Sequence, residues 1–403
     1  MLIGLDASRA NRPHKTGTEW YAFYLIKSLA AIDRHNCYRL YLDAPLSPEL
    51  EATVKNNANF SFKFLKWPFR AFWTLGRLSL EMIFHRPDVL FIPAHTLPLV
   101  HPRRTVNTIH DIAFVREHNL YLSKRMQQSI PGSRRLADFF IRLFSGGKYG
   151  ANSLDYLYWS TAFALRRAKK IITVSQFTKE EILNVYPATP AAKISVVYNG
   201  YNTALYRPDY ELKAVNEVLE KYGLSQSYFL YVGRLEKKKN TPMLIEALAL
   251  LRENYPAIKE KLVLAGDASF GYDEVRYAIE EFNLNSDVFM TGWVPEEDLP
   301  YIFNGASAFI FPSKHEGFGI PVIQALACGL PTAVSNLPVL REVAGDAVLY
   351  FDQNDKRSLA QALVEIISDK DKRRLLRHKG LVRARQFSWE KCARETLKIL
   401  TSL

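Results

Sequence analysis

Short apolar runs that alternate with helical stretches constrain the fold of this chain more than any other feature. In the first half, strand-like runs occupy Leu2–Leu5, Tyr38–Leu42, Val89–Ile92 and Thr105–Ile109, and apolar residues fall at helical spacing in Trp20–Ile32. Strands that alternate with helices are typical of βαβ units and parallel sheets. The sequence therefore predicts an α/β fold.

The second half repeats this rhythm after a polar, turn-rich stretch at Asn199–Asp209. Its predicted strands are Tyr228–Val232, Lys261–Ala265, Val288–Met290, Ala308–Phe311 and Pro331–Val334. Its predicted helices lie near Thr241–Arg252, Tyr272–Phe282, Glu296–Asn304 and Pro321–Cys328. A chain of 403 residues is too long for one ordinary core. We expect two doubly wound domains with a cleft between them and ligands at the carboxyl ends of the strands.

The loop Ser313-Lys-His-Glu-Gly-Phe-Gly-Ile-Pro321 carries the strongest local signal. It follows a predicted strand, and Pro321 suits the first turn of a helix, where its missing N–H would be unpaired in any case. Glycines let the backbone approach a ligand closely, and a helix N-terminus offers N–H donors and a positive dipole end to a phosphate. Glu316 lies just before the glycines and could accept hydrogen bonds from sugar hydroxyls. The loop therefore indicates a site for a phosphorylated sugar.

A cationic segment, Gly233-Arg-Leu-Glu-Lys-Lys-Lys-Asn240, follows another predicted strand. Arginine binds a diphosphate through two hydrogen-bond donors, whereas lysine acts as a point charge. We expect Arg234 and Lys239 to meet a diphosphate, whereas a solvated charge run explains Lys237 and Lys238 equally well.

Two further candidates lie in the first half. Lys15–Glu19 occupies the first turn between strand and helix, with the helix expected from Trp20, and it does not have the Gly-x-Gly-x-x-Gly spacing of a dinucleotide site. His110-Asp111 ends the run Thr105–Ile109, where a histidine could hydrogen-bond a substrate hydroxyl or serve only in packing. No cluster has metal-ligand spacing.

Together, these segments resemble the family 4 (group 1) retaining glycosyltransferases of the GT-B fold, in which two Rossmann-like domains face a central cleft. The resemblance rests on Gly17-Thr18, Thr108–Phe114, Ile172–Ser175, Val197–Gly200, Gly233-Arg234, Lys239-Asn240, Thr291–Val294 and Glu316–Gly319. Their order and spacing are specific, and the His-Asp-x-x-Phe version is most similar to bacterial mannosyltransferase-type enzymes that build surface polysaccharides.

The resemblance implies a metal-independent, retaining hexosyltransferase that uses a nucleotide sugar, GDP-mannose or UDP-glucose, and needs no cofactor. It implies an acceptor-side domain at 1–200, with a crossover helix at 388–403, and a donor-binding domain at 201–387. The residues it assigns to catalysis are His110, Arg234, Lys239 and Glu316. Those it assigns to donor binding are Gly17, Thr18, Asp111, Gly233, Trp293, Val294, Gly317, Phe318, Gly319, Ile320 and Gln324.

Gln324 departs from the family pattern, which has a second glutamate at this position. In the family that carboxylate accepts from both ribose hydroxyls, whereas an amide offers one acceptor oxygen and an NH2 donor. We expect ribose to be bound less tightly, or with one hydroxyl reoriented, in an enzyme that is still active.

The surplus of positive charge lies entirely in the first half of the chain. Residues 1–200 contain 27 lysines and arginines against 14 acidic residues, whereas residues 201–403 contain 26 against 27. The basic patches are Phe62–Trp73, which interleaves cations with aromatic side chains, and Lys124–Lys148. Such a surface suits an anionic membrane, and it would bring the enzyme to a glycan or lipid-linked acceptor. A buried aromatic core with a solvated rim explains the first patch almost as well.

The sequence is also compatible with other interpretations. The basic half could bind the phosphate of a small soluble sugar acceptor instead. A non-catalytic anion-binding or nucleic-acid-binding protein is a remote alternative, because no nucleic-acid module is present. Three widely spaced cysteines suit a reducing cytoplasm, and no apolar stretch predicts a signal peptide or a membrane span. We expect a cytoplasmic protein, peripheral on the inner face of the cell membrane.

Overall fold

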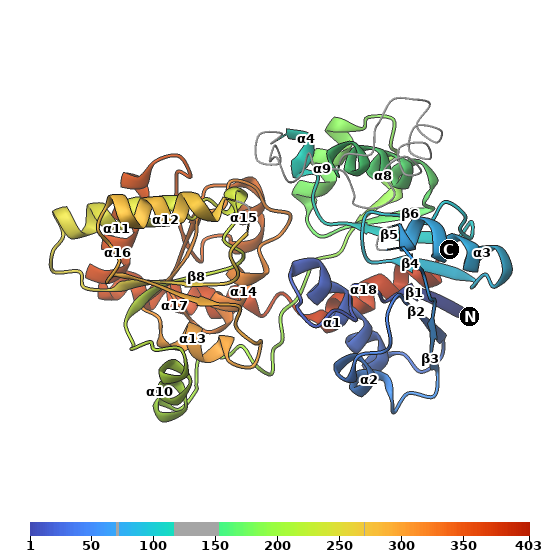
Figure 1. Cartoon of the computed structure of the whole chain (residues 1–403), viewed down its shortest axis with the longest axis horizontal. Coiled ribbons are helices and arrows are strands. Elements are labelled where there is room, and N and C mark those ends of the chain that lie inside the picture. Colours follow the sequence, from blue (N-terminus) through green and yellow to red (C-terminus); the bar gives the residue numbers. More distant parts are fainter. Residues whose placement is uncertain (70–71, 117–152, 270) are drawn as a thin grey trace. The chain divides into compact units, whose positions relative to one another are not determined.

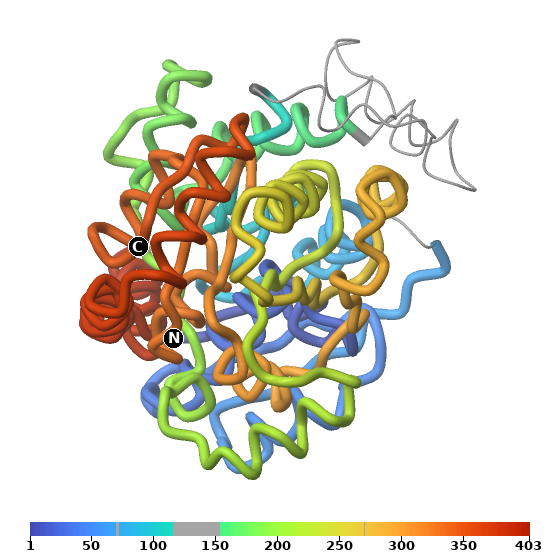
Figure 2. The backbone as a smooth tube through the Cα atoms, turned by 90° about the vertical axis from the view of Figure 1, so that its left-hand side faces the viewer, coloured from blue at the N-terminus to red at the C-terminus, as the bar shows by residue number. Residues whose placement is uncertain are grey.

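The computed structural model describes residues 1–69, 72–116, 153–269 and 271–403 (Figures 1 and 2). The chain divides into two compact units, one formed by Met1–Asn199 with Trp389–Leu403 and the other by Gly200–Ser388. These limits lie within one residue of the domain boundaries expected from the sequence. The predicted α/β class and the two Rossmann-like sheets are confirmed.

The first unit is built on a seven-stranded parallel sheet in the order β3-β2-β1-β4-β5-β6-β7. Its strands are β1 (Leu2–Asp6), β2 (Cys37–Leu42), β3 (Phe60–Phe64), β4 (Val89–Ile92), β5 (Thr105–Ile109), β6 (Lys170–Thr173) and β7 (Ile194–Val196). Strands β4 and β5 are buried along their whole length, which explains why they read as continuous apolar runs.

The helices of the first unit include one that returns from the far end of the chain. They are α1 (Gly17–Ile32), α2 (Pro48–Val54), a π-helical turn (Trp73–Arg77), α3 (Leu78–Phe84), α4 (Ala113–Arg116), α8 (Ser153–Arg167), α9 (Gln176–Val185), a 3₁₀ turn (Ala191–Lys193) and α18 (Trp389–Thr401). Helix α18 packs against α1 (Figure 1). The rings of Trp389 and Tyr24 stack there with centroids 5.5 Å apart.

The second unit has a six-stranded parallel sheet in the order β10-β9-β8-β11-β12-β13. Its strands are β8 (Tyr228–Val232), β9 (Lys261–Ala265), β10 (Val288–Gly292), β11 (Ala308–Phe311), β12 (Thr332–Ser335) and β13 (Leu349–Phe351). Its helices are α10 (Leu212–Lys221), a 3₁₀ turn (Lys237–Lys239), α11 (Pro242–Asn254), α12 (Tyr272–Glu281), α13 (Leu299–Gly305), α14 (Ile320–Ala327), α15 (Pro338–Ala344), α16 (Lys356–Ser368) and α17 (Lys370–Ala384). Helices α11 and α12 cover one face of this sheet and α13 lies on the other (Figure 1).

Among the described residues, no helix is both long and apolar enough to span a membrane. The apolar stretch Gly317–Leu340, which is rich in glycine and proline, forms a loop, helix α14, a turn, strand β12 and the start of α15.

Candidate functional site

The sheet of the second unit reverses its strand order between β8 and β11. Strands β9 and β10 continue on one side of β8, and β12 and β13 continue on the other side of β11. In an open parallel sheet, ligands bind at the carboxyl ends of the strands that flank such a reversal. The loop after β8 carries Arg234 and Lys239, and the loop after β11 carries Glu316. The topology therefore brings the two strongest sequence signals to one place.

Lys239 and Glu316 meet directly although 77 positions separate them. The Lys239 Nζ lies 2.6 Å from the Glu316 Oε1, and both side chains are largely buried. The same ammonium stands over the Phe311 ring, 5.5 Å from its centroid. A backbone hydrogen bond of 2.9 Å from the Lys314 N–H to the Lys238 carbonyl joins the two loops. The pair is thus fixed at the reversal point with its charges matched.

Arg234 differs from the lysines that follow it. Lys237 pairs with Glu274 at 3.5 Å, and Lys238 pairs with Glu236 at 3.7 Å. The Arg234 side chain is exposed and has no ion pair with any residue that the structure describes. The Arg234 guanidinium, which follows β8, is therefore available to an anionic ligand, whereas Lys237 and Lys238 each lie near a carboxylate.

The glycine loop leads into α14. Gly317, Phe318 and Gly319 are buried, and Gly319 has φ +95°, a conformation that L side chains rarely adopt. Ile320 is the first residue of α14 and Pro321 lies in its first turn, so the first backbone N–H groups of the helix need partners from outside it. Gln324 lies one turn further on, partly exposed, and its side-chain amide bonds to none of the described residues.

The remaining predicted donor residues of this unit follow β10 and β8. Trp293 and Val294 follow β10, which β9 separates from β8. Trp293 is 37% exposed and Val294 is buried. Gly233 follows β8 with φ +151°.

In the first unit, the prediction of where the first helix begins was wrong. Helix α1 begins at Gly17, not near Trp20, because Thr16 and Glu19 form a capping box that starts the helix earlier. Glu19 also pairs with Arg9 at 3.0 Å. Gly17 and Thr18 therefore lie in the first turn of α1, and a Cβ on Gly17 would meet nothing within 4 Å. The helix N-terminus presents an open backbone there.

His110 follows β5, and its hydrogen bonding sets its tautomer. The His110 Nε2 lies 3.0 Å from the Pro93 carbonyl, which can only accept, so Nε2 carries the proton and Nδ1 is the acceptor. Burial lowers the pKa of His110, which keeps the ring neutral at ordinary pH. Such a ring can accept a hydrogen bond from a sugar hydroxyl. Asp111 caps α4 by accepting from the Ala113 N–H at 3.2 Å.

Sequence reasoning missed two residues near the strand reversal of the first unit, which lies between β1 and β4. Arg9 follows β1 by three positions and His95 follows β4 by three. Burial, with the charges of Arg9 and His110, lowers the pKa of His95 to about 4. Neither residue belongs to a motif, and only the order of the strands could have drawn attention to them.

Comparison with known proteins decides the family. A family model described as "Glycosyl transferases group 1" matches residues 217–381, and one described as "Glycosyltransferase Family 4" matches residues 15–205. The O-antigen chain mannosyltransferase B of Escherichia coli is 32% identical over 334 residues, which cover 80% of this chain and 82% of the relative. This chain belongs to the family 4 (group 1) glycosyltransferases. It is therefore a glycosyltransferase, as the sequence motifs indicated.

Further relatives agree with this assignment. The O-antigen chain mannosyltransferase RfbU of Salmonella typhimurium is 24% identical over 377 residues, covering 91% of this glycosyltransferase and 90% of the relative. The crystal structure of Anabaena HepE in complex with UDP and glucose matches with a TM-score of 0.70, 19% identity and coverage of 100% and 99%. That of WaaG, a glycosyltransferase involved in lipopolysaccharide biosynthesis, matches with a TM-score of 0.71, 14% identity and full coverage of both chains. These structures confirm the GT-B fold.

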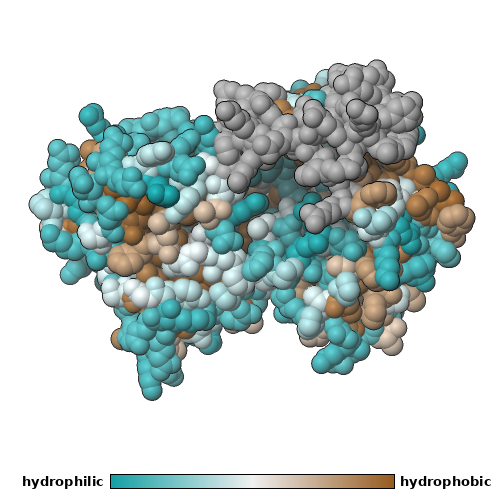
Figure 3. Space-filling model, viewed as in Figure 1, coloured by the Kyte–Doolittle hydropathy of each residue, from teal (hydrophilic) through white to brown (hydrophobic). Residues whose placement is uncertain are grey.

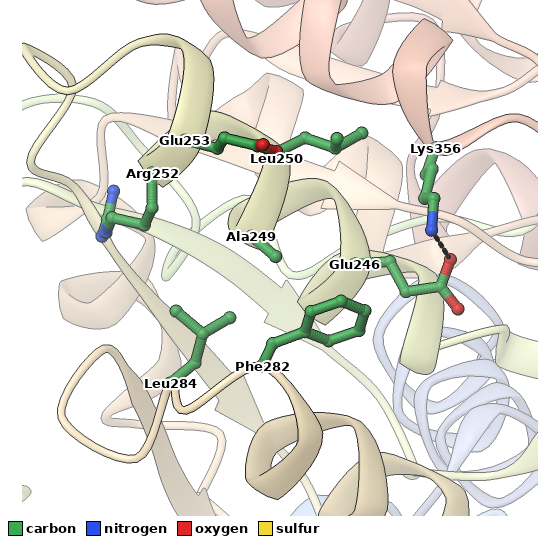
Figure 4. Close-up of a pocket in the computed structure, with 8 residues that line it drawn as sticks. All are labelled: Glu246, Ala249, Leu250, Arg252, Glu253, Phe282, Leu284 and Lys356. Carbon is green, nitrogen blue, oxygen red and sulfur yellow. Dashed lines mark ion pairs between the residues drawn. The ribbon is translucent and has the colours of Figure 1, made fainter.

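A pocket of about 400 Å³ lies elsewhere on the second unit of this glycosyltransferase (Figure 4). It is lined by Glu246, Ala249, Leu250, Arg252, Glu253, Phe282, Leu284 and Lys356. None of the predicted site residues lines it, and an ion pair of 3.2 Å between Lys356 and Glu246 closes one side. The loops at the strand reversal remain the better candidate for the donor site.

Proposed function

We propose that this glycosyltransferase transfers a hexose, with retention of configuration, from a nucleotide sugar to a glycan or lipid-linked acceptor in surface polysaccharide synthesis. The relatives at 32% and 24% identity are named O-antigen chain mannosyltransferases, which favours GDP-mannose over UDP-glucose as the donor. The observation that carries the proposal is the Lys239–Glu316 pair at the strand reversal, in the same loops as Arg234, which forms no ion pair with the described residues. This constellation suits a donor that contains both a diphosphate and a sugar.

The chemistry needs charge stabilisation more than a protein nucleophile. The bond between the sugar C1 and the phosphate oxygen breaks, and negative charge grows on the departing nucleoside diphosphate. Arg234, Lys239 and the N-terminus of α14 are arranged to stabilise that charge before it forms. The acceptor hydroxyl attacks C1 from the same face and gives its proton to the departing phosphate, while Glu316 accepts hydrogen bonds from the sugar. In this proposal neither a metal ion nor a cofactor takes part.

A thermal-shift panel of UDP, GDP, ADP and their sugars tests the donor, followed by a transfer assay with the best binder. A ligand that binds only the native state stabilises it by RT ln(1 + [L]/Kd). We expect GDP and GDP-mannose to raise Tm the most and to be turned over. A larger shift with UDP and UDP-glucose would assign the alternative donor, and no shift with any nucleotide would contradict the proposal.

We further propose that the first unit docks on an anionic membrane, because its exposed apolar side chains are concentrated in one segment. Within the described part of this unit, every exposed large hydrophobic residue except Met1 lies between positions 62 and 84. These residues are Phe62, Phe64, Phe69, Leu80, Ile83 and Phe84. Figure 3 shows hydrophobic surface at the right-hand edge, over α3. We call this surface the β3–α3 patch.

The charges around the β3–α3 patch favour an anionic surface. The sequence has no acidic residue from Ala52 to Leu80. Glu81 is buried and pairs with Lys63 at 2.5 Å and with Arg77 at 3.5 Å. Apolar side chains flanked by cations are typical of interfacial membrane binding. The first predicted patch is thus partly a packed core, around Leu65 and Trp73, and partly an exposed surface. The second, Lys124–Lys148, lies outside the described residues.

Co-sedimentation with liposomes that contain or lack anionic lipid tests this docking. Phe84→Ser should reduce recovery with anionic vesicles, because Phe84 is 75% exposed in the patch. Tyr277→Ser is the matched control, since Tyr277 is 71% exposed on the other unit. Equal recovery in the supernatant with both lipids, together with activity on small soluble sugars, would favour a soluble acceptor instead.

A further inference from the structure

Tyr231 touches the backbone of the residue proposed to bind the diphosphate. It lies on β8 and is fully buried. Its hydroxyl donates a hydrogen bond to the Arg234 carbonyl at 3.0 Å, and its ring stacks near Phe311 with centroids 6.5 Å apart. Burial raises the pKa of Tyr231 far above its usual value, so the hydroxyl stays protonated and remains a donor.

Two glycines make room for this contact. A Cβ on Gly233 would lie 2.8 Å from the Tyr231 hydroxyl. A Cβ on Gly266, which has φ +149°, would lie 2.1 Å from the Gly233 carbonyl oxygen. Any side chain at either position would push the loop away from Tyr231, because both distances are shorter than the contacts that Cβ atoms make in proteins.

The chain on the far side of Arg234 is also fixed. The Leu235 N–H donates to the Asp267 carbonyl at 2.9 Å, and the Ser269 N–H donates to the Leu235 carbonyl at 3.0 Å. Arg234 is therefore held at its own carbonyl by Tyr231 and at the next residue by the loop after β9. Its guanidinium is exposed and has no ion pair within the described chain. The position of the Arg234 side chain is therefore set by its backbone and not by an ion pair of its own.

We propose that Tyr231 is a positioning residue whose hydroxyl holds the Arg234 backbone so that the guanidinium meets the donor diphosphate. The inference rests on the proposed role of Arg234. Preorganised cations contribute most where charge develops in the transition state. A loosened backbone should therefore lower kcat more than it raises KM.

The same strand supplies a matched control. Tyr228 is also buried on β8, and its hydroxyl donates to the Ile302 carbonyl at 2.6 Å. Tyr228 lies at the amino end of the strand and Tyr231 near the carboxyl end. Tyr228→Phe and Tyr231→Phe each remove one hydrogen bond made by a buried tyrosine and keep the ring, so their costs in stability should be similar. Only Tyr231 is tied to Arg234.

Steady-state kinetics and Tm of both variants, with and without Arg234→Ala, test the inference. We expect similar falls in Tm for Tyr228→Phe and Tyr231→Phe. Tyr231→Phe should lower kcat about tenfold with KM changed less than about twofold, whereas Tyr228→Phe should leave both within about twofold. In the Arg234→Ala background, Tyr231→Phe should have no further effect on kcat, because its action passes through Arg234.

Two results would overturn the inference alone. One is equal kcat in the two phenylalanine variants of an active enzyme, and the other is an undiminished effect of Tyr231→Phe in the Arg234→Ala background. A wild-type protein that turns over no nucleotide sugar would instead contradict the proposed function, and this inference with it.

Discussion

Lys239 and Glu316 stabilise each other at a place where either charge alone would be costly. Their side chains are 16% and 10% exposed, and the 2.6 Å contact matches the two charges. Removing one partner of such a pair leaves the other poorly solvated and unpaired. In the proposed donor site, the pair would thus place a carboxylate beside the sugar and an ammonium beside the diphosphate without an external counter-ion.

Gln324 allows a direct test of ribose recognition. Its amide bonds to no described residue, and one acceptor oxygen satisfies ribose hydroxyls less well than a carboxylate does. Gln324→Glu should tighten binding of the nucleoside diphosphate about tenfold, because hydrogen bonds to a charged acceptor are stronger. Isothermal titration calorimetry measures this, and an unchanged Kd would remove ribose recognition from this residue.

The lowered pKa of His95 predicts that the stability of the protein depends on pH. Burial, with the charges of Arg9 and His110, lowers its pKa to about 4, whereas an unfolded chain has a histidine pKa of about 6.5. Between these values the unfolded state binds a proton that the native state does not, so stability is lost as pH falls. Between pH 7 and pH 5, the Tm of His95→Gln should fall by about 2–4 °C less than the Tm of the wild type. Parallel curves of Tm against pH for the two proteins would contradict the prediction that the lowered pKa of His95 makes stability depend on pH.

The residues that the sequence predicted for the site are those whose proposed role depends on local spacing. Glu316, the glycines after it and Arg234 all stand next to a predicted strand end. The contact between Lys239 and Glu316 was not predictable, because it depends on how two loops 77 positions apart come together. His95 was not predicted either, because a lone histidine three residues after a strand belongs to no sequence motif.

At the scale of elements, the apolar pattern predicted the buried strands well but did not predict the edge strand β3. Strands β4, β5, β8 and β11 lie where the runs predicted them, since burial on both faces makes such strands continuously apolar. Strand β3 was missed because edge exposure leaves Phe62 and Phe64 next to polar residues and cations. Helix α1 begins earlier than its apolar face, because a capping box and not hydrophobicity sets its start.

The first turn of α1 gives a prediction in which stability and activity separate. A Cβ on Gly17 meets nothing within 4 Å, so Gly17→Ala should leave Tm unchanged or raise it, since alanine favours a helix. If a ligand approaches this backbone, as the family resemblance implies, kcat/KM should fall about tenfold or more. Differential scanning fluorimetry and initial rates measure both.

Gly266→Ala is the opposite case. Its Cβ would lie 2.1 Å from the Gly233 carbonyl oxygen, so we expect Tm and activity to fall together. Full activity in Gly17→Ala would remove that residue from the ligand site.

At the scale of the whole molecule, the net positive charge is unevenly divided between the two halves of the chain. The second unit is nearly neutral and carries its specific cations at one strand reversal, whereas the first half carries the whole surplus of positive charge. A general affinity for nucleic acid would not require the net positive charge to be confined to one half of the chain. A donor site on one unit and attraction of an anionic acceptor surface to the other would explain it. The two sheets and their units were predictable, because repeated βαβ patterning is a property of the sequence itself.

The most direct test of the account is the initial rate of sugar transfer by Arg234→Ala compared with Lys237→Ala. Both variants remove a cation from the same segment, but Lys237 pairs with Glu274, whereas Arg234 pairs with no carboxylate in the described chain. We predict a loss of about 10²–10³ in turnover for Arg234→Ala, as for the removal of one preorganised donor, and a rate within about twofold of the wild type for Lys237→Ala. A wild-type rate in Arg234→Ala, or an equal loss in both variants, would contradict the proposed donor site.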